Sequence, residues 1–265
     1  MKIKSIFVSI VLLVFFSAIF SLKSDTEIQI IHPGEKLVYE VSYFGIKLGS
    51  IKVITEGEED LSSELTYRVK ALIDSYKGIP FVSVKTIYES WLDPTLSYSH
   101  KFVGNTKFMS DKWSYQKLLM HYDKNKLVNE MWTEKKLNFS DTVQTEKKWN
   151  DGCSLFYLAR RYTDLKRNIR IPTVIGRDTV YTDINFLGER DKTEIDAVDY
   201  PIKTIYFRGK ADWEGIYGLS GKFEGWFSDD AARVPIFAKM NVIVGRVNIE
   251  LIEWTRDGWK PPKAN

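Results

Sequence analysis

Alternation of apolar and polar residues with a period of two most constrains the fold of this 265-residue chain. Residues 37–43 place apolar side chains on one face of an extended segment and mostly polar ones on the other, as in a strand with one wet side. The pattern returns over residues 65–71. Residues 82–92 carry apolar side chains on both faces, which predicts a more central strand.

Turn signals separate many such segments. Asp93-Pro94, residues 123–125 and residues 176–178 carry the residue types that favour turns. Short strands at this spacing predict a mostly β, antiparallel meander that forms a barrel or a strongly curved sheet. We expect further strands at residues 97–103, 113–122, 126–132, 141–148, 179–187, 193–197 and 203–209.

The segment from Gly221 to Leu251 predicts a strand, a tight polar turn and a long return strand. Asp229 and Asp230 lie in the turn, and Arg233 is a candidate partner for them. Adjacent carboxylates can also bind calcium or share a proton, but neighbouring residues of a strand point to opposite faces. Turn formation is therefore the favoured role of this pair.

The N-terminal segment resembles a secretory signal. Lys2 and Lys4 precede an apolar run over residues 6–20, which small and polar residues follow. The run is shorter than the roughly 20 residues that span a bilayer, so we expect cleavage of residues 1–24 and no permanent membrane span. The periplasm, the cell envelope or the outside of the cell are the expected locations. Residues 25–265 then form a single β domain.

Removal of that segment takes away three lysines and no acid, which leaves 35 basic and 35 acidic residues. No basic block remains to serve as a footprint for nucleic acid, or to attract a strongly anionic membrane surface. The lone Cys153 excludes an internal disulfide framework. The apolar core and the sheet hydrogen bonds must hold the fold.

One helix is expected at residues 152–162, with Asp151 as its N-cap. Asp151, Ser154, Tyr157 and Arg160 follow the pattern D-x-x-S-x-x-Y-x-x-R. Successive members rotate by about 60° around a helix, so they cannot all point into one small site. We therefore interpret them as a cap, a packing tyrosine and an arginine that pairs with the sheet.

This pattern resembles one in an exported bacterial family catalogued as domain of unknown function 3108 (DUF3108). Residues 34–39 with Gly45 and Gly49 resemble its opening strand and turn. Residues 207–211 with Gly215 and Gly218 resemble a loop before its final hairpin, and residues 227–235 resemble the turn of that hairpin. The resemblance covers residues 34–253 and implies a fold and an exported location, but no chemistry and no cofactor.

Aromatic residues suggest a possible binding role. Removal of the N-terminal segment leaves 33 of the 37 aromatic residues. A curved sheet lined with aromatic rings can hold an apolar or ring-shaped ligand, and exported half-barrels carry lipids in envelopes. The alternative is that the rings simply form the core of a β protein. The candidate lining residues are Tyr39, Tyr43, Tyr67, Tyr88, Trp91, Trp113 and Trp226.

The evidence for a catalytic site in the sequence is weaker than the evidence for a binding site. His32, His100 and His121 lack metal-ligand spacing, although the last two could face one another on neighbouring strands. Cys153 in the first helical turn would need a base to act as a nucleophile, and a buried packing role is favoured. We assign no catalytic residue and no metal site.

The leading functional hypothesis is therefore a non-catalytic envelope protein that binds or carries an apolar or glycan-like ligand. The first alternative is a scaffold whose edge strands pair with an envelope protein. The second is a hydrolase of envelope polymers, which would need converging carboxylates or a Cys/His pair.

Overall fold

The computed structural model describes residues 29–80, 82–213, 220–242 and 245–265. The expected signal segment, Phe81, Gly215 and Gly218 lie outside the described residues. Within those ranges no helix is long and apolar enough to cross a membrane.

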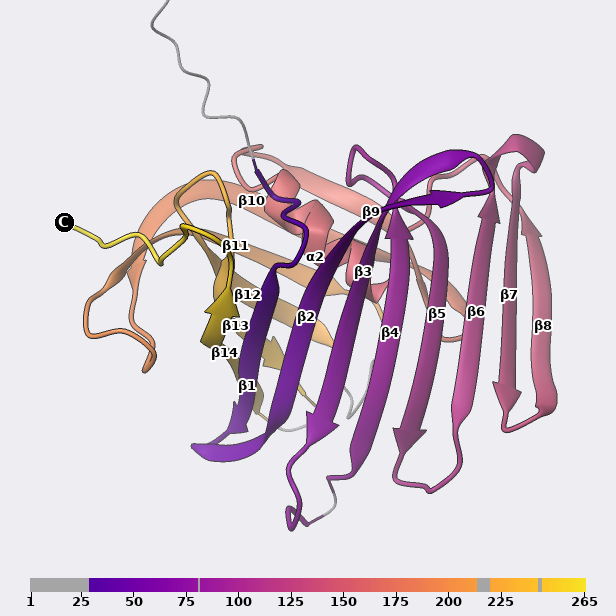
Figure 1. Ribbon diagram of the computed structural model, residues 1–265, viewed down its shortest axis with the longest axis horizontal. Helices are drawn as coiled ribbons and strands as arrows, with labels where there is room; N and C mark the ends of the chain where they lie inside the picture. Colours follow the sequence, from indigo (N-terminus) through magenta and orange to yellow (C-terminus); the bar gives the residue numbers. More distant parts are fainter. Residues whose placement is uncertain (1–28, 81, 214–219, 243–244) are drawn as a thin grey trace, which may run out of the picture.

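The described residues form one 14-stranded antiparallel sheet, as the sequence predicted (Figure 1). Strands that are consecutive in the chain pair with one another, except β8 and β9, and β1 also pairs with β14. The first and last strands therefore meet in the middle of the sheet, while β8 and β9 end it. The strands are β1 (Lys36–Tyr43), β2 (Ile46–Leu61), β3 (Glu64–Ser75), β4 (Val84–Leu92), β5 (Ser99–Phe108), β6 (Ser114–His121), β7 (Lys126–Thr133), β8 (Lys136–Gln144), β9 (Asn168–Ile175), β10 (Asp178–Thr193), β11 (Ile202–Ala211), β12 (Gly221–Ser228), β13 (Pro235–Asn241) and β14 (Arg246–Thr255).

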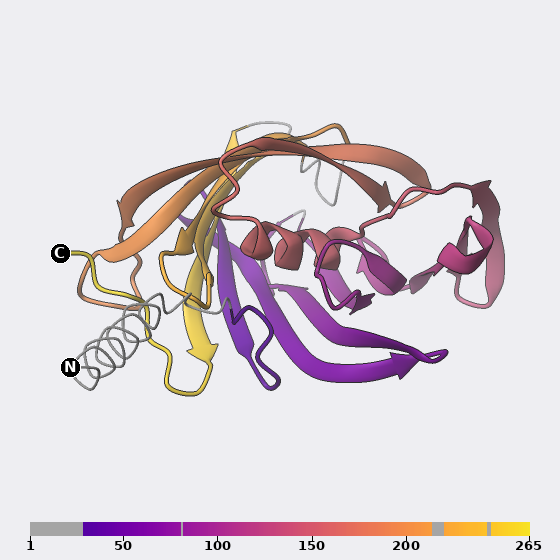
Figure 2. The same cartoon turned by 90° about the horizontal axis from the view of Figure 1, so that it is seen from above.

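The sheet folds over on itself into two facing halves, β1–β8 and β9–β14 (Figure 2). The helix α2 (Gly152–Arg161) connects the halves in sequence and lies between them in space. A short 3-10 helix, η1 (Tyr122–Lys124), joins β6 to β7. The result is an open, barrel-like shell around a helix.

Irregular pairing gives the sheet its curvature. The register shifts between Thr55 and Gly57 in β2, with one extra residue, and between Phe186 and Glu189 in β10, with two. Extra residues of this kind bend a strand. Two glycines of the opening segment have clear roles. Gly45 makes the β1–β2 turn at a φ of 78°, and a Cβ on Gly49 would lie 2.3 Å from the backbone oxygen of Asp74.

Two apolar clusters hold the helix. Tyr157 and Cys153 belong to the larger cluster, which includes Leu37, Leu118 and Ile236 from the sheet. Leu158 and Ala159 pack in a second cluster with side chains of β9–β12. The helix is thus buried between the two halves, and the larger cluster draws side chains from both of them.

The predicted boundaries of several strands were wrong. The return strand after Asp229 and Asp230 is two strands, because Val242 N–H donates to the Gly245 carbonyl in a turn between β13 and β14. Of residues 193–197, Thr193 ends β10 and the rest lie in the loop that follows it. Thr193 and Ile195 are both buried there, which resembles the alternation of a strand. Residues 145–148 leave the sheet after β8.

Two strands were missed. An acidic run in the second half of β2 interrupts its alternation, since that half extends past the core. β9 is an edge strand that contains Pro172, a residue that disfavours strand assignment.

Candidate ligand-binding cavity

A cavity of about 1040 Å³ lies between α2 and the inner face of the sheet. Its wall is dominated by aliphatic and aromatic side chains from both halves. They include Val41, Ile51, Val69, Ile73, Val84, Met131, Ile184, Phe223, Met240 and Ile249 from the strands, with Leu155 and Phe156 from the helix.

The cavity occupies one end of the shell. In an antiparallel meander successive turns alternate between the two ends of the strands. The turns β1–β2, β3–β4, β5–β6 and β7–β8 therefore share one end, at the bottom of Figure 1. Lining residues such as Tyr43, Ser75 and Phe108 belong to this end. Helix α2 lies toward the opposite end and closes the cavity there.

Few polar groups reach the wall, and most of them are occupied. Gln116 Nε2 donates to the Gly176 carbonyl at 2.6 Å, which links β6 to the β9–β10 turn of the other half. Thr182 Oγ1 accepts from Trp213 Nε1 at 2.9 Å. Burial raises the pKa of the Tyr88 hydroxyl, so this group stays neutral. Lys70, Asp74 and Glu224 are the charged members of the lining, and Lys70 and Glu224 form ion pairs within the protein. The wall that a ligand would meet is therefore mainly apolar.

The structure brings two of the seven expected lining residues, Tyr43 and Tyr88, to the cavity. Tyr39 is buried in the core, where its hydroxyl donates to the Pro235 carbonyl at 3.1 Å. Tyr67 packs against the same core outside the cavity wall.

The three tryptophans do not line the cavity either. Trp91 lies on the opposite face of β4 from Tyr88, with Lys101 Nζ 3.8 Å from the centre of its ring. Lys107 lies over the ring of Trp113, and Trp226 Nε1 donates to Asp191 at 2.8 Å. Alternation in the sequence predicted which side chains share a face of each strand. It did not predict which of the two faces points into the cavity.

The members of the helix motif do not all share one site, as their rotation predicted, because Asp151 and Ser154 cap the start of the helix. Tyr157 and Arg160 instead converge on Thr55 and Glu35, whose side chains hydrogen-bond each other at 3.5 Å. Asp151 caps the helix by accepting from the N–H groups of Cys153 and Ser154, and Ser154 Oγ accepts from Asp151 N–H. Asp151 also accepts from Ser90 Oγ of β4 at 2.7 Å. Burial nevertheless raises the pKa of the Asp151 carboxyl. This end of the helix is fixed to the sheet by its own cap.

Further along the helix, the Tyr157 hydroxyl hydrogen-bonds Thr55 of β2 at 2.8 Å. Arg160 then forms a bidentate ion pair with Glu35, at 2.7 and 3.1 Å, and donates to the Ala232 carbonyl at 3.0 Å. Arg256 donates to the same carboxylate. We call Glu35, Arg160 and Arg256 the buried clasp.

The clasp joins three distant parts of the chain beside the helix. Burial opposes charge on Glu35, but the two guanidinium groups outweigh it, so the pKa of Glu35 is lowered. The side chains of Glu35 and Arg160 are no more than 1% exposed, so the pair has no access to a ligand in solvent. The clasp therefore positions the helix over the cavity.

The expected turn is formed, although Arg233 pairs elsewhere. Asp230 Oδ1 accepts from the N–H groups of Ala232 and Arg233, both at 3.0 Å, in the manner of an aspartate turn. Arg233 pairs with Asp164 and donates to the Arg161 carbonyl at 3.1 Å, at the C-terminal end of the helix. Asp229 pairs with Arg190 and Lys203 instead.

The candidate nucleophile is poorly placed for chemistry. Burial and the nearby Asp151 raise the pKa of the Cys153 thiol well above its usual value, which opposes the effect of the helix dipole. His100 lies against Asp93, Tyr98 and Tyr122 rather than beside the thiol. Among the described residues no group of three His, Cys, Asp or Glu side chains could hold a metal ion.

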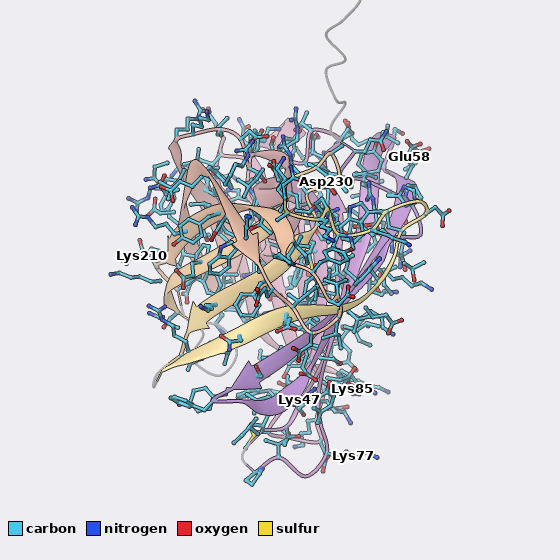
Figure 3. The ribbon with its side chains drawn as sticks, turned by 90° about the vertical axis from the view of Figure 1, so that its left-hand side faces the viewer. Lys47, Glu58, Lys77, Lys85, Lys210 and Asp230 are labelled. Carbon is cyan, nitrogen blue, oxygen red and sulfur yellow. The ribbon has the colours of Figure 1, made fainter. Side chains whose placement is uncertain are left out.

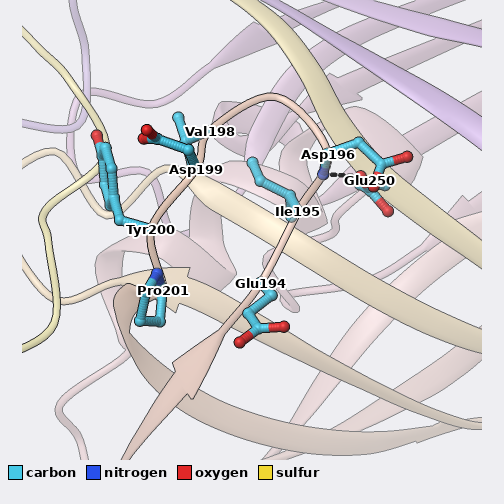
Figure 4. Close-up of a pocket in the computed structure, with 8 residues that line it drawn as sticks. All are labelled: Glu194, Ile195, Asp196, Val198, Asp199, Tyr200, Pro201 and Glu250. Atoms are coloured by element: carbon cyan, nitrogen blue, oxygen red, sulfur yellow. Dashed lines mark hydrogen bonds between the residues drawn. The ribbon is translucent and has the colours of Figure 1, made fainter.

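A second, smaller pocket of about 380 Å³ lies in the loop between β10 and β11 (Figure 4). Glu194, Asp196, Asp199 and Glu250 contribute to its wall, and Asp196 N–H donates to Glu250 Oε1 at 2.8 Å. Its acidic wall contrasts with the mainly apolar wall of the large cavity.

Sequence reasoning missed most of the cavity wall and the role of Arg256. The inward positions of β2, β3 and β13 carry ordinary aliphatic residues that any sheet would bury. An arginine near the C-terminus has no local signal for its pairing with Glu35, which lies 221 residues away.

A scan against protein-family models found no match, and neither did a search of curated proteins. The DUF3108 resemblance therefore stays a prediction. Among solved structures, the chain is similar to a beta-barrel-like protein of domain of unknown function DUF1849 from Brucella abortus, with a TM-score of 0.56 and 9% identity. The match covers 84% of this chain and 97% of that one. It shows a shared beta-barrel-like fold.

Proposed function

We propose that this protein is an exported, non-catalytic binder or carrier of an apolar ligand in the cell envelope. The observation that carries the proposal is the mainly apolar wall of the 1040 Å³ cavity. That volume is at the upper end of the range for ligand pockets. It has room for on the order of 30 groups the size of a water molecule, enough for a long acyl chain.

The wall favours an apolar ligand over a glycan. A sugar needs many converging hydrogen-bond partners, because an unsatisfied buried hydroxyl is costly. Here Gln116 and Thr182 are already bonded within the protein, and the remaining wall is mainly hydrocarbon. Apolar surface in a concave site is stabilised by a ligand that removes it from water.

The test measures binding of a fluorescent long-chain fatty acid to the delipidated protein. Ala71→Trp should weaken binding at least about tenfold, because Ala71 lines the cavity and an indole would fill part of it. Leu72→Trp is the matched control, since the next residue of β3 points to the opposite face. Equal affinities in the two variants, or no binding by the parent protein, would overturn the proposal.

The scaffold alternative has one supporting feature. β8 ends the sheet and is exposed along most of its nine residues, so its outer edge could accept a partner strand. Thr142→Pro would block pairing along that edge without touching the large cavity, because the Thr142 N–H faces away from β7 and donates to the side chain of Asp141. Loss of a copurifying envelope protein in this variant alone would favour the scaffold.

A further inference from the structure

Four hairpins of the β1–β8 half lie at the cavity end and are similar in composition. We define the hairpin rim as the turns β1–β2, β3–β4, β5–β6 and β7–β8 with two residues of each flanking strand. Six of the eight exposed large apolar residues in the described part of the chain lie in it. They are Phe44, Ile46, Tyr76, Phe108, Met109 and Leu137.

Exposure is highest at the tips. Phe44 is 79% exposed and Ile46 57%, on either side of the β1–β2 turn, and Met109 is 53% exposed in the β5–β6 turn. Side chains exposed to this degree leave most of their apolar surface in water. A group of such side chains on one edge of a protein marks an interaction surface.

Lysines accompany these apolar tips. The hairpin rim contains seven lysines, which are Lys47, Lys77, Lys85, Lys107, Lys112, Lys135 and Lys136, against three acids, Asp74, Asp111 and Glu134. The turns β2–β3, β4–β5 and β6–β7 at the other end, counted in the same way, contain two lysines and four acids. Figure 3 shows Lys47, Lys77 and Lys85 at one end of the molecule and Glu58 at the other.

The balanced charge of residues 25–265 thus conceals a separation between the two ends. Whole-chain composition gave no reason to expect attraction to an anionic membrane, because it averages over this separation. The fold gathers lysines from turns spread over 90 residues, from Lys47 to Lys136, onto one edge.

We infer that the hairpin rim docks on the surface of an anionic phospholipid bilayer and directs the cavity mouth toward it. This rests on the proposed function. The cavity is continuous with the rim, because Tyr43, Ser75 and Phe108 belong to both. Apolar tips enter the interface, while lysines remain at the headgroups, where anionic lipid attracts them. An apolar ligand would then pass between bilayer and cavity with little exposure to water.

A protein partner fits this surface less well. The cores of protein interfaces are depleted in lysine, whereas here lysines alternate with the apolar tips. Lysine side chains are also strongly hydrated and flexible, which suits a lipid surface more than a close-packed protein contact. The bilayer is therefore the occupant to which the charge and the exposed tips are complementary.

The test reports which end of the full chain meets the membrane. An environment-sensitive fluorophore is attached at Ser110→Cys in the rim, or at Glu58→Cys at the opposite end as the matched control. Cys153 is 7% exposed with a raised thiol pKa, so labelling is selective for the introduced cysteine. Each protein is mixed with vesicles of phosphatidylglycerol and phosphatidylcholine in equal parts, or of phosphatidylcholine alone.

We expect a blue shift for the rim label on the anionic vesicles and none for the label at position 58. The measurement reports which labelled end enters the bilayer. Attachment of the protein through its apolar N-terminal run would therefore not produce a shift specific to the rim label. A rim label that stays in water on anionic vesicles, or that shifts only with a protein partner, would overturn the inference.

Two sets of variants separate the apolar and charged contributions. Phe44→Ser, Ile46→Ser and Met109→Ser together should abolish the shift, whereas Leu65→Ser with Ile252→Ser, exposed apolar positions outside the rim, should leave it unchanged. Lys77→Gln, Lys112→Gln and Lys135→Gln should weaken partitioning on the order of 100-fold. Lys36→Gln, Lys124→Gln and Lys260→Gln make the same change in net charge elsewhere and should have little effect.

The same variants keep the two proposals distinguishable. None of the substituted rim residues lines the cavity, so fatty acid binding in solution should be unchanged in all of them. Normal binding with a rim label that never enters anionic vesicles would refute docking and leave the proposed function standing. Rim insertion in a protein that binds no fatty acid would refute the proposed function and with it the delivery role of the rim.

Discussion

Helix α2 contacts two regions that differ in packing, the open cavity and the buried polar contacts that fix the helix to the sheet. Toward one end, α2 presents Leu155 and Phe156 to an open apolar volume. Elsewhere on the helix, buried Tyr157 hydrogen-bonds Thr55 of β2, and buried Arg160 pairs with Glu35, just before β1. Because these polar contacts hold the helix in place, its position does not depend on apolar side chains filling the cavity. Packing is tight where the helix is fixed and loose where space is kept for a ligand.

The strongest test of this division removes one member of the buried clasp. Arg160→Met should lower the free energy of unfolding by about 3 to 5 kcal/mol, because it leaves Glu35 buried with only Arg256 as a partner. Arg161→Met is the matched control at the next, exposed position and should cost less than about 0.5 kcal/mol. Denaturant unfolding of both variants gives the comparison. Similar losses in the two would show that the helix is not fixed by the clasp.

A second test compares the cost of an isoleucine-to-alanine substitution in the packed core with its cost at the cavity wall. Ile236→Ala removes a fully buried side chain from the packed core and should cost about 2 to 5 kcal/mol. Ile73→Ala removes the same atoms beside space that is already open, so we expect less than half that loss. Thermal and denaturant unfolding would measure both. Equal losses would mean that the cavity is as closely packed as the core.

Acid should weaken the clasp before it affects the cavity wall. The folded-state pKa of Glu35 is lowered, so its contribution to stability is complete above the unfolded pKa of about 4.3 and is lost as the pH falls through the folded value. Stability measured from pH 7 downward should therefore decline below about pH 4. Glu35→Gln should be less stable at neutral pH and should show a shallower decline in acid.

The smallest expected effect concerns Cys153. Its thiol is buried and its pKa is raised, so modification by a thiol reagent at neutral pH should follow opening of the fold rather than ionisation of the thiol. Bound fatty acid should slow the reaction further, since Cys153 also lines the cavity. Rapid labelling of the native protein would show that the cavity is open to water around α2.

Local patterns predicted the parts of this fold that local chemistry controls. Period two gave most strands, and Asp151 marked the start of the helix because a cap acts within one turn. Asp229 and Asp230 marked their turn for the same reason. The sequence failed at β2 and β9, where an acidic run and a proline break the pattern although the neighbouring strands still supply hydrogen bonds.

The sequence by itself determined the class of fold, the capped helix and the absence of a disulfide framework, since these depend on residues close together in the chain. Only the tertiary structure decided which face of each strand is inside, as the exclusion of Trp91 and Trp226 from the cavity wall shows. It also decided the pairing of Glu35 with Arg160 and Arg256, and the gathering of lysines and apolar tips on one rim. These features join residues that are distant in sequence, and the curvature of the whole sheet, to which every strand contributes, brings them together.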